Sequence, residues 1–357
     1  SDRCLKIFKL LGEKGYPQFH LKQINYHIYK SKVGLFSQMR DISKQLRYDL
    51  ISSLGNNFSS IESVDSKDGN DCKMVTFKGK DGACFETVLT RENQTSTLHL
   101  SSQVGCAFSC SYCATGKIGL KRQLVVDEIV DQVLYFLKNS ELVDNLSFSG
   151  MGEPLANPHV FRALQLLSSP EYLGLSQRRF HVWTIGVLPG LKKLNEMFPQ
   201  VNLGWTMNSP FMEERNHLIP INRLYPIPEV FQLLDDRLLK CRRRIWINYL
   251  LLSGINDSIE HAKALVDIIR GRSLIVRHLY HLNLLAPNAL YSMMDQPEQM
   301  NEISASFFQA ILRQNSISCS VRHSLGQDIG AGLGQLQAGY DQSSEGTLFR
   351  KRSCLTF

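Results

Sequence analysis

The sequence predicts an α/β protein whose parallel strands curve into a partial (β/α) barrel. From Leu98 onward, short apolar runs of strand type alternate with longer segments of helical periodicity. That alternation is typical of parallel strands joined by crossover helices. The chain has 357 residues, of which 43% are hydrophobic and 20% charged, so it can bury a sizeable core. In such folds the chemistry lies at the carboxyl ends of the strands.

Two smaller units precede the barrel. Over residues 1–56, apolar side chains recur at helical spacing, as at Ile24 and Ile28, and predict a small helical accessory domain. Over residues 57–97, two β-type runs, 74–77 and 85–89, flank the turn sequence Gly79-Lys80-Asp81-Gly82. Turn chemistry of this kind predicts a β-hairpin, here serving as a linker.

The barrel core is expected over residues 98–342, with a basic tail over 343–357. Its helical patterns fall at 126–139 and 258–270, and the strand-like runs that can be delimited lie at 145–149, 180–184, 201–205, 245–251 and 278–284.

The net charge is 40 − 33 = +7 with histidine neutral. This value favours a polyanionic partner, but a solvated basic surface would give the same value. No run approaches the ~20 apolar residues of a membrane span, and the start lacks the pattern of a signal peptide. We therefore expect a cytoplasmic protein without a membrane partner. The nine cysteines are an odd count in a long chain, which argues against a disulfide scaffold.

Three of the cysteines, Cys106, Cys110 and Cys113, fall within eight residues as Cys-x3-Cys-x2-Cys. Thiolates are the preferred ligands of iron–sulfur clusters, and three of them leave one iron of a cubane open. A closed zinc site would need a fourth ligand, for which His99 is a candidate. Three buried or free thiols are the other alternative.

A second motif, Gly150-Met151-Gly152-Glu153-Pro154, follows the strand-like run at 145–149. Glycines at a strand end let the backbone approach a ligand, and Glu153 can accept hydrogen bonds from an amino group. Taken alone, the motif is equally typical of a turn before a helix.

Together these motifs resemble the radical S-adenosylmethionine (SAM) superfamily, and nearly the whole chain is similar to its adenosine carbon-2 methyltransferases of ribosomal and transfer RNA and their carbon-8 relatives. The resemblance implies a [4Fe–4S] cluster on the three cysteines, with SAM bound at the open iron. It implies that Glu86 is the proton acceptor, for which a solvent-facing strand residue is the alternative. The SAM-contacting positions that it implies are Gly152, Glu153, Thr206, Asn208 and Asn288.

Besides the cluster ligands, members of this family use two further catalytic cysteines, and this chain has other residues at both positions. Leu333 stands at the methyl-carrying position and His99 at the position seven residues before the cluster. Leucine has no nucleophile, so the family's methyl transfer through cysteine cannot run at this site as written. Cys84 and Cys319 are the candidates for a substitute carrier. In the SAM-binding elements, Trp183 takes the place of a serine.

Three functions remain open. The first is an RNA-modifying enzyme of the methyltransferase family, acting on ribosomal or transfer RNA and reduced by a donor such as flavodoxin or ferredoxin. The second is a radical SAM enzyme that abstracts hydrogen from another substrate without methyl transfer through cysteine. The third is an RNA-binding remnant, against which the intact cysteine triplet and Gly152-Glu153 argue.

Overall fold

The computed structural model describes residues 2–31, 33–285, 302–322, 325–332, 335–336, 340–341 and 348–349. Its first unit is helical: α1 (Arg3–Glu13), α2 (Phe19–Tyr29), the short η1 (Phe36–Gln38) and α3 (Lys44–Leu54). The side chains of Asp2 and Ser43 cap α1 and α3 by accepting from the backbone N–H of Leu5 and Leu46. The predicted apolar positions Ile24 and Ile28 are buried.

Four antiparallel strands come next: β1 (Ile61–Asp68), β2 (Cys72–Gly79), β3 (Cys84–Glu92) and β4 (Thr95–Leu100). The predicted hairpin is the β2–β3 pair. It is not an isolated linker, however, because β4 also pairs in parallel with β7 (Asn145–Phe148). The hairpin region and the barrel therefore form one ten-stranded sheet in the order β1-β2-β3-β4-β7-β8-β9-β10-β11-β12.

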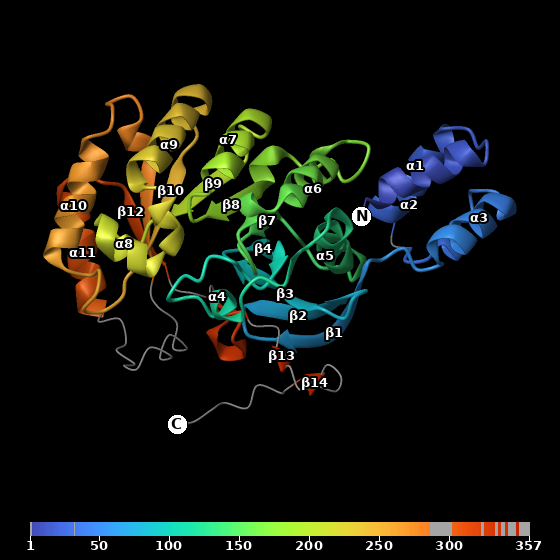
Figure 1. Cartoon of the computed structure of the whole chain (residues 1–357), viewed down its shortest axis with the longest axis horizontal. Coiled ribbons are helices and arrows are strands. Elements are labelled where there is room, and N and C mark those ends of the chain that lie inside the picture. Colours follow the sequence, from blue (N-terminus) through green and yellow to red (C-terminus); the bar gives the residue numbers. More distant parts are fainter. Residues whose placement is uncertain are drawn as a thin grey trace.

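The predicted parallel barrel is confirmed (Figure 1). Strands β4 and β7 to β12 run parallel in chain order, and each of the expected strand runs overlaps one of them. The remaining barrel strands are β8 (Phe180–Thr184), β9 (Asn202–Thr206), β10 (Ile245–Leu250), β11 (Tyr280–Leu285) and β12 (Cys319–Arg322). The helices are α4 (Ala114–Ile118), α5 (Val126–Lys138), α6 (Pro158–Ser168), α7 (Leu188–Met197), α8 (Met212–Leu218), α9 (Ile227–Cys241), α10 (Ile259–Arg270) and α11 (Glu302–Gln314).

The two faces of the barrel sheet differ in polarity. Along β8, Phe180 and Val182 are buried, whereas His181 and Trp183, which alternate with them, are partly exposed. Because side chains alternate along a strand, one face packs against the helices and the other, here called the concave face, carries polar and aromatic groups. Among the described helices, none is both long enough and apolar enough to cross a membrane.

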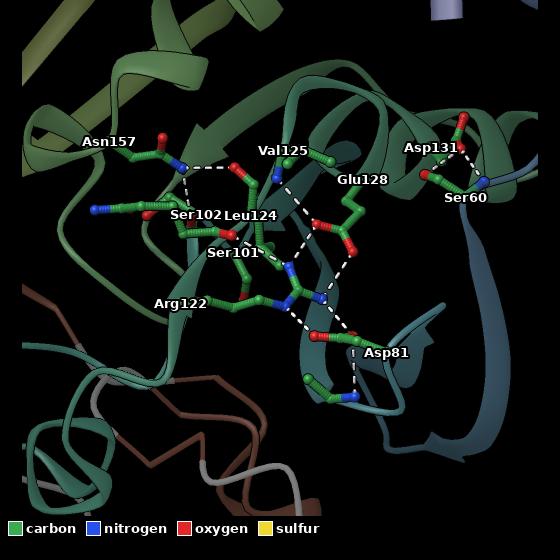
Figure 2. A network of polar contacts seen from close by, with 12 residues as sticks. Ser60, Asp81, Ser101, Ser102, Arg122, Leu124, Val125, Glu128, Asp131 and Asn157 are labelled. Carbon is green, nitrogen blue, oxygen red and sulfur yellow. Dashed lines mark hydrogen bonds and ion pairs between the residues drawn. The ribbon is translucent and has the colours of Figure 1, made fainter. Parts of the chain in front are cut away.

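A polar network fixes the segment that follows the cysteine triplet (Figure 2). Arg122, on the short strand β6 (Arg122–Gln123), bonds Asp81 in the hairpin turn and both carboxylate oxygens of Glu128 on α5, at 2.8 and 2.9 Å. Asn157 bonds the backbone carbonyls of Ser102 and Leu124 at 2.7 and 2.8 Å. The Arg122 guanidinium is therefore paired with two carboxylates of the protein itself.

A buried ion pair joins the helical unit to the barrel. Arg3 on α1 and Asp131 on α5 approach to 2.9 Å, with side chains only 7% and 3% exposed. The Asp131 carboxylate also accepts from the backbone N–H and hydroxyl of Ser60, both at 2.7 Å. A carboxylate with this many donors holds its position rigidly, so α1 is fixed against α5.

Candidate active site

The three clustered cysteines lie on the loop between the short strand β5 (Gln103–Val104) and α4. The loop opens at Gly105, where φ is +74° and a Cβ would lie 1.8 Å from the carbonyl oxygen of Gly119, so only glycine fits. The loop ends at Cys113, which is the N-cap residue of α4. The backbone N–H of Cys113 donates to the carbonyl of Cys110 at 3.1 Å.

The thiols of this loop are close enough to influence one another. The pKa of Cys106 is raised to about 12, chiefly by burial; the backbone N–H of Phe108 opposes the shift, and neighbouring Cys113 and Glu153 contribute to it. Burial also raises the pKa of Cys110 strongly, with Cys113 and Cys106 adding to it. Such thiols stay protonated near neutral pH unless a bound cation stabilises the thiolates. The donor set therefore suits a site that becomes anionic only when metal binds.

Among the described residues, no three His, Cys, Asp or Glu side chains converge closely enough to hold one metal ion. A cubane makes a different demand from a zinc ion, because its thiolates bind separate irons around a pocket. Four buried side-chain atoms in the described part of the chain lack a hydrogen-bond partner, and two of them lie at this site: Ser111 Oγ in the loop and Asn208 Nδ2 after β9. Buried polar atoms without a hydrogen-bond partner are expected where a polar ligand binds.

The Gly-Glu motif follows β7 and is bonded directly to the segment that leads into the cysteine loop. The carbonyl of Met151 accepts from the backbone N–H groups of Ser102 and Gln103 at 2.9 and 3.1 Å. The Gln103 side chain accepts from Glu153 N–H at 2.9 Å. At Gly152 φ is +93°, and a Cβ would lie 2.5 Å from the Gln103 side chain. The two sequence motifs thus form one site, and Gln103 is a positioning residue that the sequence analysis missed.

The Glu153 carboxylate is almost fully buried at the ends of β7 and β8. It accepts from Leu155 N–H at 3.0 Å, the Thr184 hydroxyl at 2.7 Å and Ile185 N–H at 3.0 Å. These three donors use part of its acceptor capacity and leave room for one more. Burial raises the pKa of Glu153 from 4.5 to about 7, although the three donors oppose the shift.

The predicted SAM residues after β9 lie at the next strand end. Asn208 is fully buried at φ +56°, and its Oδ1 accepts from Leu250 N–H at 2.9 Å. Its carbonyl accepts from the Asn256 side chain at 2.6 Å, so the backbone is fixed while Nδ2 is left unpartnered. Thr206 ends β9 and is partly exposed. Asn288 lies outside the described residues.

Glu86 lies on β3 and is only 3% exposed, so the solvent-facing alternative is wrong. Its backbone carbonyl accepts from the Ser101 hydroxyl, which in turn accepts from Met151 N–H at 2.8 Å. Alternation along β3 places Glu86 on the same face as Thr90, and Thr90 bonds His99 at 3.0 Å. Glu86 therefore shares the concave face with His99.

His99 is engaged at both ring nitrogens, by Thr90 at 3.0 Å and by the Ser149 hydroxyl at 2.8 Å. Burial, and then His181, lower its pKa to about 4. The ring is therefore neutral at physiological pH, with one nitrogen donating and the other accepting. Ser147 extends this network from Ser149 to Trp183, at 2.8 and 3.1 Å.

The other strand cysteines differ in the face of the sheet on which their side chains lie. The thiol of Cys319 on β12 faces the carbonyl of Gln309 on α11, so its proposed reach into the pocket is wrong. Cys84 shares the face of Glu86 by strand alternation. Cys72, which the sequence analysis left out, pairs with Thr90 and would lie 2.9 Å from a Cβ at Gly326. Leu333 lies outside the described residues.

The comparisons with known proteins agree with this geometry. The model of the radical SAM superfamily matches residues 100–266. The chain is 39% identical over 339 residues to the ribosomal RNA large subunit methyltransferase Cfr of Staphylococcus warneri and of Staphylococcus aureus, covering 95% of this chain and 97% of each relative. The crystal structure of a radical SAM methyltransferase from Sphaerobacter thermophilus superposes with a TM-score of 0.84 at 31% identity, covering 94% of this chain and 97% of that one.

These matches span both the fold and the site. The chain therefore belongs to the radical SAM superfamily and, within it, to the Cfr-like family of methyltransferase enzymes, a membership that implies a [4Fe–4S] cluster and SAM as cofactors.

Proposed function

We propose that this enzyme modifies an adenosine of ribosomal RNA, with its cluster held by Cys106, Cys110 and Cys113. The observation that carries the proposal is the direct bonding of the cysteine segment to the Glu153 loop through Met151 and Gln103. This bonding lets one ligand touch both motifs. The relatives named ribosomal RNA methyltransferases, similar over nearly the whole chain, support the substrate class.

When bound, the cluster supplies the electron that cleaves SAM to a 5′-deoxyadenosyl radical. In the proposal, Glu153 accepts from the amino group of SAM with its remaining acceptor site, and Gly152 keeps the approach open. Asn208 donates its unpartnered Nδ2–H to SAM, and Thr206 and Asn288 line the same cofactor. Glu86, buried on the concave face, accepts the proton from the substrate base. A flavodoxin or ferredoxin of the cytoplasm reduces the cluster.

A basic surface on the helical unit supports RNA as the partner. A shallow, open surface depression is lined by six residues, none of which carries a carboxylate. We call its charged part, Arg40, Lys44 and Arg47, the α3 basic face; the adjacent Tyr48 is 67% exposed. Phosphates bind clustered cations, and an exposed ring can stack on a base. We accordingly assign residues 1–56 to RNA binding, 57–97 to the linking strands, 98–342 to catalysis and 343–357 to a basic tail.

A second candidate follows from His99. In the family that the sequence resembles, this position carries a cysteine, and the imidazole here is neutral and bonded at both nitrogens. With Leu333 at the other cysteine position, methyl transfer through these two residues is lost. The candidate is a radical SAM enzyme that abstracts hydrogen from a different substrate and leaves no methyl group from SAM on the product.

Methyl-labelled SAM separates the two candidates. Reduced, reconstituted protein is incubated with ribosomal RNA, and label is measured in the RNA alongside the yield of 5′-deoxyadenosine. Label in an adenosine supports the methyltransferase. A yield of 5′-deoxyadenosine without labelled RNA supports the second candidate, and no 5′-deoxyadenosine at all contradicts both.

Intact-protein mass spectrometry of the same reaction tests for a substitute carrier. A gain of one methylene at Cys84 or Cys72 would restore a cysteine-carried mechanism, because both lie on the β2–β3 face that contains Glu86. Cys319 serves as the internal control, since its thiol faces α11. We expect no gain at any of the three, because a carrier must lie within roughly 3–3.5 Å of the reacting groups.

A further inference from the structure

One guanidinium at the site is buried without a carboxylate. Arg215 on α8 is fully buried, and its hydrogen bonds go only to neutral acceptors. They are Asn222 Oδ1 at 3.0 Å and the backbone carbonyls of Thr206 at 2.9 Å, Ile185 at 2.9 Å and Met207. Within the part of the chain that the structure describes, Arg215 forms no ion pair.

An unpaired buried charge is costly. Moving an ion out of water costs several kcal/mol even after relaxation. Burial lowers the pKa of Arg215 to about 10, so it stays protonated at neutral pH and cannot avoid the cost by losing its proton. The backbone carbonyls offset part of the cost, and the face of Trp205, whose ring centre lies 4.9 Å from the guanidinium carbon, offsets a further part. An anion would offset more.

The nearest candidate anion is the cysteine loop. Cys110 packs in one cluster with Leu218 and Ile219, less than two turns beyond Arg215. The loop is bonded to α8, because Ser111 N–H donates to the carbonyl of Leu218 at 3.1 Å.

We propose that Arg215 is the buried counter-charge of the iron–sulfur centre, a positioning residue that favours its reduced state. This inference rests on the proposed function, which puts a [4Fe–4S] cluster on Cys106, Cys110 and Cys113. Three thiolates and a 2+ cubane sum to −1, and one electron from a low-potential donor makes the sum −2. A cation fixed in a low-dielectric interior stabilises the more negative state.

Two substitutions test the uncompensated charge: one deletes it, and the other compensates it with a carboxylate. Arg215→Gln deletes it, together with several hydrogen bonds. Asn222→Asp keeps Arg215 and adds a carboxylate beside its Nε, replacing an amide oxygen that already accepts at 3.0 Å. The second variant leaves the guanidinium and its carbonyl bonds in place, so it keeps the test available if Arg215→Gln does not fold. Arg215→Lys retains the charge with fewer bonds and should restore much of the wild-type potential.

The matched control is Arg237→Gln. Arg237 is 2% exposed and also bonds backbone carbonyls, those of Phe198, Pro199 and Val201, together with the Asn195 side chain. Its bonds go to the segment that precedes the amino end of β9, whereas Arg215 bonds Thr206 and Met207 at the carboxyl end of that strand. Its loss should lower stability without moving the cluster potential.

The experiment is a potentiometric titration of each reconstituted protein, followed by electron paramagnetic resonance of the reduced cluster. The midpoint potential should shift to more negative values in Arg215→Gln and in Asn222→Asp, and stay at the wild-type value in Arg237→Gln. One common potential for all variants with a full complement of iron would overturn the inference while leaving the proposed function intact. A wild-type protein that binds no cluster would instead overturn the proposed function.

Discussion

Replacing Glu153 by glutamine should stabilise the cofactor-free protein near neutral pH while weakening its function. The reason is the burial of the carboxylate, which raises the pKa of Glu153 from 4.5 to about 7. A folded-state pKa above the unfolded value means that ionisation opposes folding. The stability that the protonated group contributes is complete below pH 4.5 and is lost as the pH rises through 7.

The size of the effect follows from the same two values. At about 1.4 kcal/mol for each pKa unit, the carboxylate costs about 3 kcal/mol of folding free energy at pH 8 and under about 1 kcal/mol at pH 5. Glutamine resembles the protonated carboxyl in shape and carries no charge, so Glu153→Gln should match the wild type at pH 5 and exceed its stability by up to about 3 kcal/mol at pH 8. The amide group facing Ile185 N–H reduces this gain, because two donors then meet.

The assay is urea denaturation of cluster-free protein at pH 5 and pH 8, with Glu196→Gln as the matched control on the exposed side of α7. SAM affinity, measured by calorimetry on the reconstituted protein, should fall by about 10- to 100-fold in Glu153→Gln, the range that a charge-assisted hydrogen bond predicts. A stability difference that does not change with pH would refute the burial argument. Unchanged SAM affinity would reduce the Gly152-Glu153 motif to a turn.

Other predictions follow from the cluster loop, the domain contact and the RNA surface. Cys110→Ala should abolish the SAM-responsive cluster of roughly four irons, whereas Cys241→Ala keeps it; stoichiometric zinc in anaerobically purified protein would contradict this assignment. Asp131→Ala leaves Arg3 buried without its partner and should cost about 3–5 kcal/mol in denaturation, a loss that the double variant with Arg3→Met should largely recover. Reversing all three charges of the α3 basic face should reduce the magnitude of the slope of log RNA affinity against log salt concentration by about 3 and leave SAM binding unchanged. An unaltered slope would exclude this surface as an RNA-binding site.

The sequence predicts the strands well where apolar and polar residues alternate over five or more positions. The run from Asn145 to Ser149 alternates in this way and contains β7 as expected. It does not predict contacts that depend on strand order, such as the bond from Thr184 to Glu153, because residues 31 positions apart meet only after β7 and β8 pair. The error at Cys319 is of another kind. Because β12 has only four residues, its alternation does not distinguish a strand from a loop, so the sequence alone does not assign the face of Cys319.

The electrostatics of the site argue against an RNA-binding remnant. Glu153 is a buried carboxylate, Arg215 a buried guanidinium without a carboxylate, and Cys110 a buried thiol with a raised pKa, and all three lie around the same strand ends. Each opposes folding in its charged form when the site holds no ligand, and perturbed groups of this kind gather where a ligand compensates them. His99 is different, because its neutral ring is satisfied by two hydroxyls. The buried groups proposed to hold the cluster and SAM therefore carry charges that a ligand would compensate, whereas His99 is a neutral, fully bonded side chain of the barrel sheet.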